Sequence, residues 1–232
     1  MISKKPVLIW DIDGTLLEPK PVGRQALNIT FAELYDIDDA FDDLDFSGAT
    51  DHALWAQVVE HAPHLQDIPA ERDRFFARYV HVLGDVLARN PLNPLPSVSD
   101  LIPELSARGW PLALATGNIR AGAFVKLGAA GLAPYFPVGG FSHPHADRAA
   151  LILQARQFFP GRIPVVIGDT PRDIEASRQI GAVAVGTATG RHSSAVLSSH
   201  GADLVFDVLP HASSFLEAIV EGLTRRAQEK RS

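Results

Sequence analysis

The stretch VLIWDIDGT, residues 7–15, joins four consecutive apolar residues to an acidic turn. A short apolar run that ends at acidic or turn-forming residues is typical of a buried β-strand. Four more such runs follow, at residues 112–115, 165–167, 182–185 and 204–206. The segments between the later runs have helical periodicity, at roughly residues 121–130, 148–159, 171–180 and 194–200. This alternation predicts an α/β fold with a parallel sheet that is covered by helices on both faces.

The first two predicted strands are separated by far more residues than the dozen or more that a crossover connection needs. Between them, helical periodicity recurs at residues 24–34, 51–61 and 70–88. Prolines gather near the two ends of this segment, at residues 18–22 and 90–96. The pattern predicts a core of residues 1–17 and 95–232, with an inserted helical cap of residues 18–94.

The composition restricts the classes of function that are open to the chain. The 232 residues contain no cysteine, which excludes disulfides, thiolate-bound zinc, iron–sulfur clusters and thiol nucleophiles. The formal net charge of −6 disfavours nucleic-acid binding, because phosphate backbones are bound mainly by clustered Lys and Arg. No apolar run has the length of a signal peptide or a membrane span, so we expect a cytoplasmic protein without a membrane partner.

Acidic and polar residues directly follow three of the predicted strands. They are Asp11 and Asp13 after the first strand, Thr116, Gly117 and Asn118 after the second, and Asp169 after the third. Ligands of open parallel sheets bind beyond the carboxyl ends of the strands, so we expect these side chains to converge. Asp173 lies four residues after Asp169 at a predicted helix start, which lets both carboxylates face the same way.

A cluster of Asp11, Asp169 and Asp173 would repel itself without a cation. Like charges about 4 Å apart cost several kcal/mol at the effective dielectric of a protein. Magnesium prefers oxygen ligands and often binds one or two carboxylates together with a substrate phosphate. The sequence therefore predicts Mg²⁺ as the cofactor.

Thr116, Gly117 and Asn118 lie where a strand gives way to a helix. Free backbone N–H groups at such a helix start can hold a phosphate. A phosphoryl group held there would expose phosphorus to attack by Asp11, while Asp13 protonates the leaving oxygen. This acid role requires a proton on Asp13, and we expect neighbouring carboxylates to raise its pKa.

Three motifs occur in order along the chain: DIDGT at residues 11–15, ATGN at 115–118 and GDTPRD at 168–173. In order and context they resemble the motifs of the haloacid dehalogenase superfamily, especially its phosphoglycolate-phosphatase-like branch. The segments GLAPYF (131–136), GAVAVGTATG (181–190) and GADLVF (201–206) are also similar to that branch. The resemblance covers nearly the whole chain and implies a Rossmann-like core with an inserted α-helical cap.

The resemblance also implies a role for each matching residue. Asp11 would be the nucleophile that forms an aspartyl-phosphate, Asp13 the general acid and base, and Thr116 a phosphate ligand. Magnesium would be held by Asp11, the backbone carbonyl of Asp13 and Asp169, with Asp173 in support. Because the dehalogenases of the superfamily lack the acid at the position of Asp13, a phosphatase is favoured.

One basic residue of the family pattern is not where the resemblance expects it. The usual Lys-Pro pair after the GLAPYF-like segment is missing. We expect Arg148, in HPHADR, to neutralise the phosphate and the nucleophile instead. Lys126, in FVKLG, is the alternative, but its place in the preceding helix favours a solvated charge.

The turn Gly48-Ala49-Thr50-Asp51 resembles a cap turn that faces the core site in this branch, so Thr50 and Asp51 are candidate substrate contacts. The other interpretation is an N-cap for the helix that begins there.

Two further patterns are weaker. His143, His145 and Asp147 form an H-x-H-x-D pattern typical of zinc sites, but no further histidine completes it, so we expect a surface loop. The acidic residues 36–45 lack the glycine of a calcium-binding loop, and we expect a solvated part of the cap.

These observations predict a magnesium-dependent phosphatase that hydrolyses a small phosphorylated metabolite through an aspartyl-phosphate. The candidate site comprises Asp11, Asp13, Thr116 and Arg148 for catalysis, Gly117, Asn118, Thr50 and Asp51 for substrate, and Asp11, Asp13, Asp169 and Asp173 for metal. Two alternatives remain open. One is a phosphomutase of the same superfamily, and the other is a receiver-like signalling module, which needs no cap.

Overall fold

The computed structural model describes residues 5–62, 65 and 68–229. Among them, six parallel strands form one sheet in the order β3-β2-β1-β4-β5-β6. The strands are β1 (Val7–Trp10), β2 (Leu112–Thr116), β3 (Gly139–Phe141), β4 (Pro164–Gly168), β5 (Val183–Thr187) and β6 (Leu204–Phe206). The predicted α/β fold is confirmed, and all five predicted strands are present.

Strand β3 is the one that the sequence patterns do not predict. Two of its three residues are glycine, which has low β-propensity. A Cβ atom added to Gly140 would lie 1.8 Å from the carbonyl oxygen of Leu151. Helix α6 therefore packs directly against the backbone of β3, and only glycine leaves room for it.

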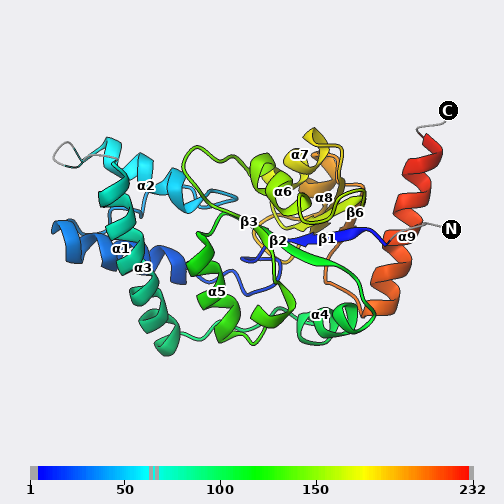
Figure 1. Ribbon diagram of the computed structural model, residues 1–232, viewed down its shortest axis with the longest axis horizontal. Helices are drawn as coiled ribbons and strands as arrows, with labels where there is room; N and C mark the ends of the chain where they lie inside the picture. The colour runs from blue at the N-terminus through cyan, green and yellow to red at the C-terminus, as the bar shows by residue number, and fades with distance from the viewer. Residues whose placement is uncertain (1–4, 63–64, 66–67, 230–232) are drawn as a thin grey trace.

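Helices cover both faces of the sheet (Figure 1). They are α4 (Val98–Ala107), α5 (Arg120–Ala129), α6 (Arg148–Arg156), α7 (Pro171–Gln179), α8 (Ser194–Ser199) and α9 (Ala212–Glu229), with a short 3-10 turn at Ala133–Tyr135. Side chains of β1 alternate between the two faces, as expected for a strand. Leu8 and Trp10 join the cluster that includes α4 and α9, whereas Val7 and Ile9 pack with α6 and α7.

The sequence patterns miss α4 and most of α9. Helix α4 contains Pro103 in its interior, which disfavours a helix by removing a backbone donor. Helix α9 buries apolar residues at positions 215, 216, 219 and 223, a helical spacing that would have indicated it.

The predicted helical insertion consists of α1 (Val22–Tyr35), α2 (Asp51–Glu60) and α3 (Pro69–Arg89). These helices lie together at one end of the molecule, and β1 runs toward them (Figure 1). An aromatic cluster packs between them: the ring centroids of Trp55 and Phe75 are 4.6 Å apart, and those of Phe31 and Phe75 are 5.9 Å apart. These rings belong to the same apolar cluster as Trp10 of β1 and Leu114 of β2, so the core of the insertion is continuous with the core beside the sheet.

The chain crosses between the sheet and these helices twice, and the two crossings lie side by side. The backbone N–H of Leu95 donates to Leu16, and that of Glu18 donates to Asn93. We infer that this pairing is the hinge of the cap predicted at residues 18–94.

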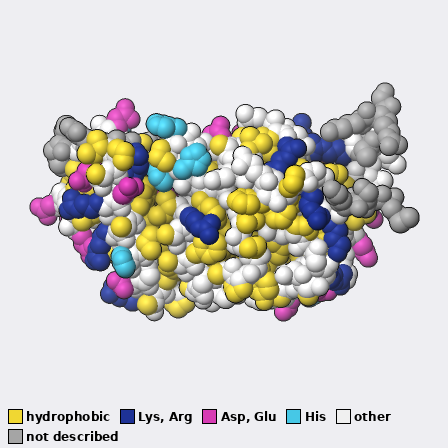
Figure 2. Space-filling model, viewed as in Figure 1, with side chains coloured by type: hydrophobic (Ala, Val, Ile, Leu, Met, Phe, Trp, Pro, Cys, Tyr) yellow, Lys and Arg dark blue, Asp and Glu magenta, His cyan; other side chains and the backbone are white. Residues whose placement is uncertain are grey.

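Charged side chains of both signs are interspersed on the surface of α1 and α3 (Figure 2). The aspartates of residues 36–45 are exposed, as expected for a solvated segment. Within the described part of the chain, no helix combines the length and the apolar character needed to cross a membrane.

Candidate active site

Three carboxylates meet beyond the carboxyl ends of the central strands. Asp11 follows β1, Asp169 follows β4, and Asp173 lies in the first turn of α7. Each is less than 10% exposed, and each offers an oxygen within 4.8 Å of an oxygen of the other two. The structure thus brings together residues that are far apart in sequence.

These acids destabilise one another's charged forms. Burial, followed by the charges of Asp11 and Asp173, raises the pKa of Asp169 well above its ordinary value. Burial and the neighbouring acids also raise the pKa of Asp11 to about 6, although Arg148 opposes this shift. A cation among the three carboxylates would relieve the repulsion.

The donor set fits a small hard cation. All three groups offer carboxylate oxygen, which magnesium prefers. The space around Asp169 depends on two glycines: an added Cβ would lie 2.4 Å from Asp169 Oδ2 at Gly14 and 1.8 Å from it at Gly190. These glycines leave room for the carboxylate at the centre of the site.

Arg148 faces the acids, as the sequence analysis expected. It begins α6, where Asp147 caps the helix by accepting from Ala150 N–H. Its side chain is 6% exposed, and its Nη2 atom lies 2.9 Å from Asp11 Oδ2 and 2.5 Å from Asp173 Oδ1. The guanidinium therefore bridges the predicted nucleophile and Asp173.

Lys126 is not the solvated charge that the sequence analysis expected. Its side chain is only 5% exposed, and Nζ lies 2.8 Å from both carboxylate oxygens of Asp13. Lys126 shares the buried face of α5 with Gly122, Ala123 and Leu127. A lysine on that otherwise apolar face is the signal that could have revealed the ion pair.

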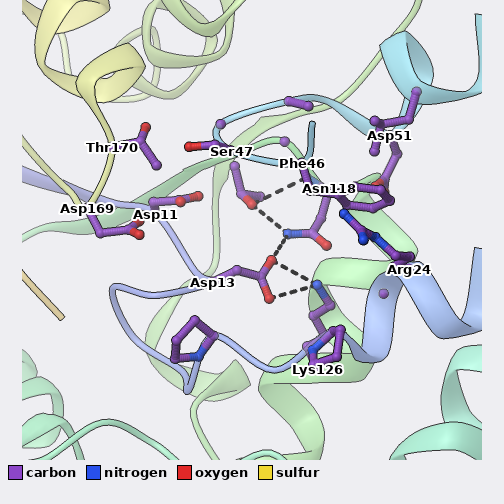
Figure 3. Close-up of a pocket in the computed structure, with 18 of the residues that line it drawn as sticks. Asp11, Asp13, Arg24, Phe46, Ser47, Asp51, Asn118, Lys126, Asp169 and Thr170 are labelled. Carbon is purple, nitrogen blue, oxygen red and sulfur yellow. Dashed lines mark hydrogen bonds and ion pairs between the residues drawn. The ribbon is translucent and has the colours of Figure 1, made fainter. Parts of the chain in front are cut away.

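The expected upward shift in the pKa of Asp13 is also wrong. Burial alone would raise this pKa, but the charge of Lys126 and hydrogen bonds from Asn118 and Lys126 together lower it. Figure 3 shows both side chains pointing at the Asp13 carboxylate. Asp13 is therefore ionised at neutral pH in this arrangement.

The loop after β2 holds the predicted phosphate contacts. Asn118 Nδ2 donates to Thr116 Oγ1 and to Asp13 Oδ2, both at 2.8 Å. Thr116 is fully buried. The loop therefore connects the end of β2 to the acid that follows β1.

The cap turn docks on this loop. Asp51 N–H donates to the carbonyl of Gly117, and Ile119 N–H donates to Asp51 Oδ2, both at 2.7 Å. A Cβ atom at Gly117 would lie 2.0 Å from the carbonyl oxygen of Ala49. The turn that begins α2 and the loop after β2 are thus in direct contact beside the acids.

Thr50 and Asp51 have different positions in this turn. The side chain of Thr50 caps α2 by accepting from Ala53 N–H, as the N-cap interpretation expected, and Thr50 does not line the cavity. Asp51 does line it, and burial raises its pKa to about 6.

The H-x-H-x-D pattern forms a surface loop, as expected. His143, His145 and Asp147 are exposed, and Asp147 is engaged in capping α6. The only group of three or more potential metal ligands among the described residues is the one of Asp11, Asp169 and Asp173.

A family model described as haloacid dehalogenase-like hydrolase matches residues 6–181. The chain belongs to the haloacid dehalogenase-like hydrolase family. The resemblance inferred from DIDGT, ATGN and GDTPRD is thereby confirmed, and so is the prediction of an enzyme.

Two curated relatives of this hydrolase are named as phosphatases. A probable phosphatase IndB of Dickeya dadantii is 27% identical over 227 residues, which cover 94% of this chain and 96% of that protein. A phosphoglycolate phosphatase of Synechococcus elongatus is 28% identical over 186 residues, 79% of this chain and 84% of its own length.

The fold of this hydrolase is also found in solved structures. The crystal structure of CbbY from Rhodobacter sphaeroides in complex with phosphate has a TM-score of 0.67 at 20% identity. The match covers 88% of this chain and 95% of that one. It shows a shared fold.

Asp11 and Asp169 of this hydrolase border a cavity of about 240 Å³ between the sheet edge and the predicted cap (Figure 3). Its core side includes Asp11, Asp13, Thr116, Lys126 and Arg148, and its cap side includes Arg24, Leu27, Phe46, Leu54 and Tyr79. The sequence motifs identify most of the core side. They carry no signal for Arg24 or Tyr79, which reach the cavity only because α1 and α3 fold over it.

Proposed function

We propose that this protein is a magnesium-dependent phosphatase that hydrolyses a small organic phosphate monoester through an aspartyl-phosphate on Asp11. One observation carries the proposal: Asp11, Asp169 and Asp173 converge within 4.8 Å, with Arg148 2.9 Å from Asp11. The family and the phosphatase names of its relatives support the same reaction class.

Asp11, the backbone carbonyl of Asp13 and Asp169 would hold magnesium, with Asp173 in support. The bound cation would neutralise charge on the phosphate oxygens and on the carboxylates.

The first step is attack by a carboxylate oxygen of Asp11 on phosphorus. A bond forms between Asp11 and phosphorus, and the ester P–O bond breaks with its electron pair on the leaving oxygen. Thr116 and Asn118 orient the phosphoryl group, and the charge of Arg148 stabilises the transition state. Asp13 gives the leaving oxygen its proton.

In the second step, water attacks phosphorus of the aspartyl-phosphate and Asp13 removes a proton from that water. The bond between Asp11 and phosphorus breaks, which restores the Asp11 carboxylate and releases inorganic phosphate. The ion pair with Lys126 suits this second role, because it keeps Asp13 ionised. The acid role of the first step requires that Asp13 takes up a proton when substrate binds.

The cap, proposed as residues 18–94, would exclude bulk water from the phosphoryl group. The backbone contacts of Asp51 with Gly117 and Ile119 support a closed position in which the cap covers the acids. Release of product would then require the cap to open.

The test uses the purified protein, Mg²⁺ and a panel of phosphate monoesters labelled at the phosphoryl group. We expect labelled inorganic phosphate as product and an acid-stable labelled protein after rapid quenching. Asp11→Asn should abolish both signals, and Asp43→Asn, an exposed acid of the cap, should change neither. Turnover retained by Asp11→Asn would contradict the proposal, and a rearranged phosphate ester would indicate a mutase instead.

A further inference from the structure

Two buried hydrogen-bond donors on the cap side of the cavity have no partner. They are Nε of Arg24, on α1, and the hydroxyl of Tyr79, on α3. Buried donors are nearly always paired, because an unpaired donor forfeits its hydrogen bond to water. Both residues line the same cavity, and an acceptor group of a ligand bound there would satisfy them.

The position of Arg24 is fixed by its neighbours. Its Nη2 atom donates to the carbonyl of Leu44 at 3.0 Å, and its guanidinium lies over the ring of Phe46, 4.5 Å from the centroid. These contacts hold the guanidinium plane while Nε remains free.

No described carboxylate forms an ion pair with Arg24, although acids are abundant nearby. The aspartates of residues 36–45 are exposed, and the one among them that forms a described ion pair, Asp45, contacts Arg172. The charge of Arg24 therefore lacks a described counter-charge within the protein. An anionic group of the ligand would supply one.

Tyr79 borders the same space together with Gly23 and Lys126. The point where a Cβ of Gly23 would lie is 3.7 Å from the hydroxyl of Tyr79 and 3.6 Å from Nζ of Lys126. Any larger side chain at position 23 would fill this space. We call the space bordered by Gly23, Arg24, Tyr79 and Lys126 the cap-side recess.

The Arg24 end of the recess lies away from the predicted nucleophile. In Figure 3, Arg24 extends toward Asn118, across the cavity from Asp11 and Asp169. A phosphoryl group at Asp11 would therefore leave the other end of a short substrate near Arg24. The cavity volume of about 240 Å³ suits a molecule of a few carbon atoms.

We propose that the cap-side recess binds a second oxyanion of the substrate, which accepts hydrogen bonds from Arg24 Nε and Tyr79 Oη. The substrate class is a small phosphate monoester that carries a carboxylate or a second phosphate at its other end. This inference rests on the proposed function, and it makes Arg24 the residue that determines specificity.

The first experiment compares matched esters on the wild-type enzyme with Mg²⁺. Phosphoglycolate is paired with 2-hydroxyethyl phosphate, and 1,3-propanediol bisphosphate with 3-hydroxypropyl phosphate. We expect kcat/KM to be at least tenfold higher for the anionic member of one pair. The pair that shows the preference identifies the second anionic group of the substrate as a carboxylate or a phosphate. Equal kcat/KM values within both pairs would overturn the proposal.

Arg24→Gln should remove this preference by raising KM for the anionic ester about tenfold or more. Its kcat/KM for the neutral ester should fall by a much smaller factor than that for the anionic ester. Arg24→Lys should retain part of the preference, because it keeps the charge without the planar donor group. Tyr79→Phe should lower the preference by a smaller factor.

Arg89→Gln, an exposed arginine at the end of α3, is the control and should match wild type for both esters. Equal losses for the anionic and neutral esters in Arg24→Gln would indicate a structural role and overturn the proposal. Melting temperatures of all variants check that they are folded.

Calorimetric binding separates this inference from the proposed function. Two proteins are compared: the Asp11→Asn variant and the double variant that also carries Arg24→Gln. Each is titrated with phosphoglycolate and 2-hydroxyethyl phosphate, and then with 1,3-propanediol bisphosphate and 3-hydroxypropyl phosphate. We expect the anionic ester of one pair to bind at least tenfold more tightly only when Arg24 is present. If wild-type enzyme hydrolyses no ester, the proposed function fails, and this binding difference still decides the role of Arg24.

Discussion

The ammonium group of Lys126 lies 2.8 Å from both carboxylate oxygens of Asp13, and the two partners differ in their contact with water. The side chain of Lys126 is 5% exposed, whereas that of Asp13 is 37% exposed. Loss of Asp13 would leave a buried ammonium without this partner. Loss of Lys126 would leave a carboxylate that water can still solvate.

Asp13→Asn should therefore destabilise the protein more than Lys126→Met. A fully buried pair would lose about 3–5 kcal/mol, but water screens Asp13, so we expect about 2 kcal/mol for Asp13→Asn. Lys126→Met keeps an unbranched side chain without the terminal charged group and should cost less than about 1 kcal/mol. Urea unfolding at pH 7 without magnesium measures the free energy of unfolding of both variants. A larger loss of this free energy in Lys126→Met than in Asp13→Asn would contradict the prediction.

The buried carboxyl of Asp51 should make stability depend on pH. Burial raises its pKa from an ordinary value of 3.8 to about 6. Between these values the unfolded chain releases the proton while the folded protein keeps it, so rising pH destabilises the fold. Since one pKa unit corresponds to about 1.4 kcal/mol, the penalty reaches about 3 kcal/mol above pH 6.

Asp51→Asn should abolish this penalty, because the amide oxygen can still accept from Ile119 N–H. Its free energy of unfolding relative to wild type should rise by about 2.4 kcal/mol from pH 4 to pH 7, because part of the penalty is already present at pH 4. Asp43→Asn, at an exposed position, is the matched control and should show no such trend. A constant difference between Asp51→Asn and wild type across this range would contradict the prediction.

Gly117 should be required for closure of the cap. An alanine Cβ there would lie 2.0 Å from the carbonyl oxygen of Ala49, so Gly117→Ala should push the cap turn off the core. We expect kcat/KM to fall at least about tenfold, because the site geometry tolerates displacements of only about 1 Å.

Gly128→Ala is the matched control for that substitution. Gly128 lies in α5, and an added Cβ would meet no atom within 4 Å. The alanine should keep activity unchanged and stabilise the protein by about 0.5–1 kcal/mol, since glycine is a poor helix former. Equal activities of the two variants in a phosphate-release assay would show that cap docking at Gly117 is not needed.

The sequence predicts the sheet and the acids at its edge because both depend on local patterns. Apolar runs end at Asp11, Thr116 and Asp169, and parallel topology brings strand ends together whatever the details of packing. Strand β3 is not predicted from the sequence, because its glycine at position 140 is required by the close approach of α6, which is a tertiary contact. Local propensity at a glycine cannot report such a contact.

The charge state of Asp13 also depends on tertiary contacts. Its sequence neighbours are acidic, which favours a raised pKa, but Lys126 arrives from α5, more than a hundred residues later. The same reason applies to Arg24 and Tyr79, since only the folding of α1 and α3 brings them to one cavity. Motifs thus identify the groups that share a loop, whereas the packing of helices decides their partners.

Arg148 and magnesium should compensate for one another. Arg148 bridges Asp11 and Asp173, so Arg148→Met would leave two buried acids without their described counter-charge. Without metal, we expect the free energy of unfolding to fall by about 3 kcal/mol. Turnover should fall at least about a hundredfold, because the variant lacks the guanidinium that we propose stabilises the transition state.

Added magnesium should recover most of the lost stability of Arg148→Met without restoring turnover. A ligand at a hundred times its Kd stabilises the folded state by about 2.7 kcal/mol, and the unpaired acids of the variant should bind the cation more tightly than wild type does. The magnesium-induced rise in melting temperature should therefore be larger in Arg148→Met than in wild type, and Arg89→Met should behave like wild type. An identical rise in all three proteins would mean that the cation binds away from Asp11 and Asp173, and their proposed role as metal ligands would be wrong.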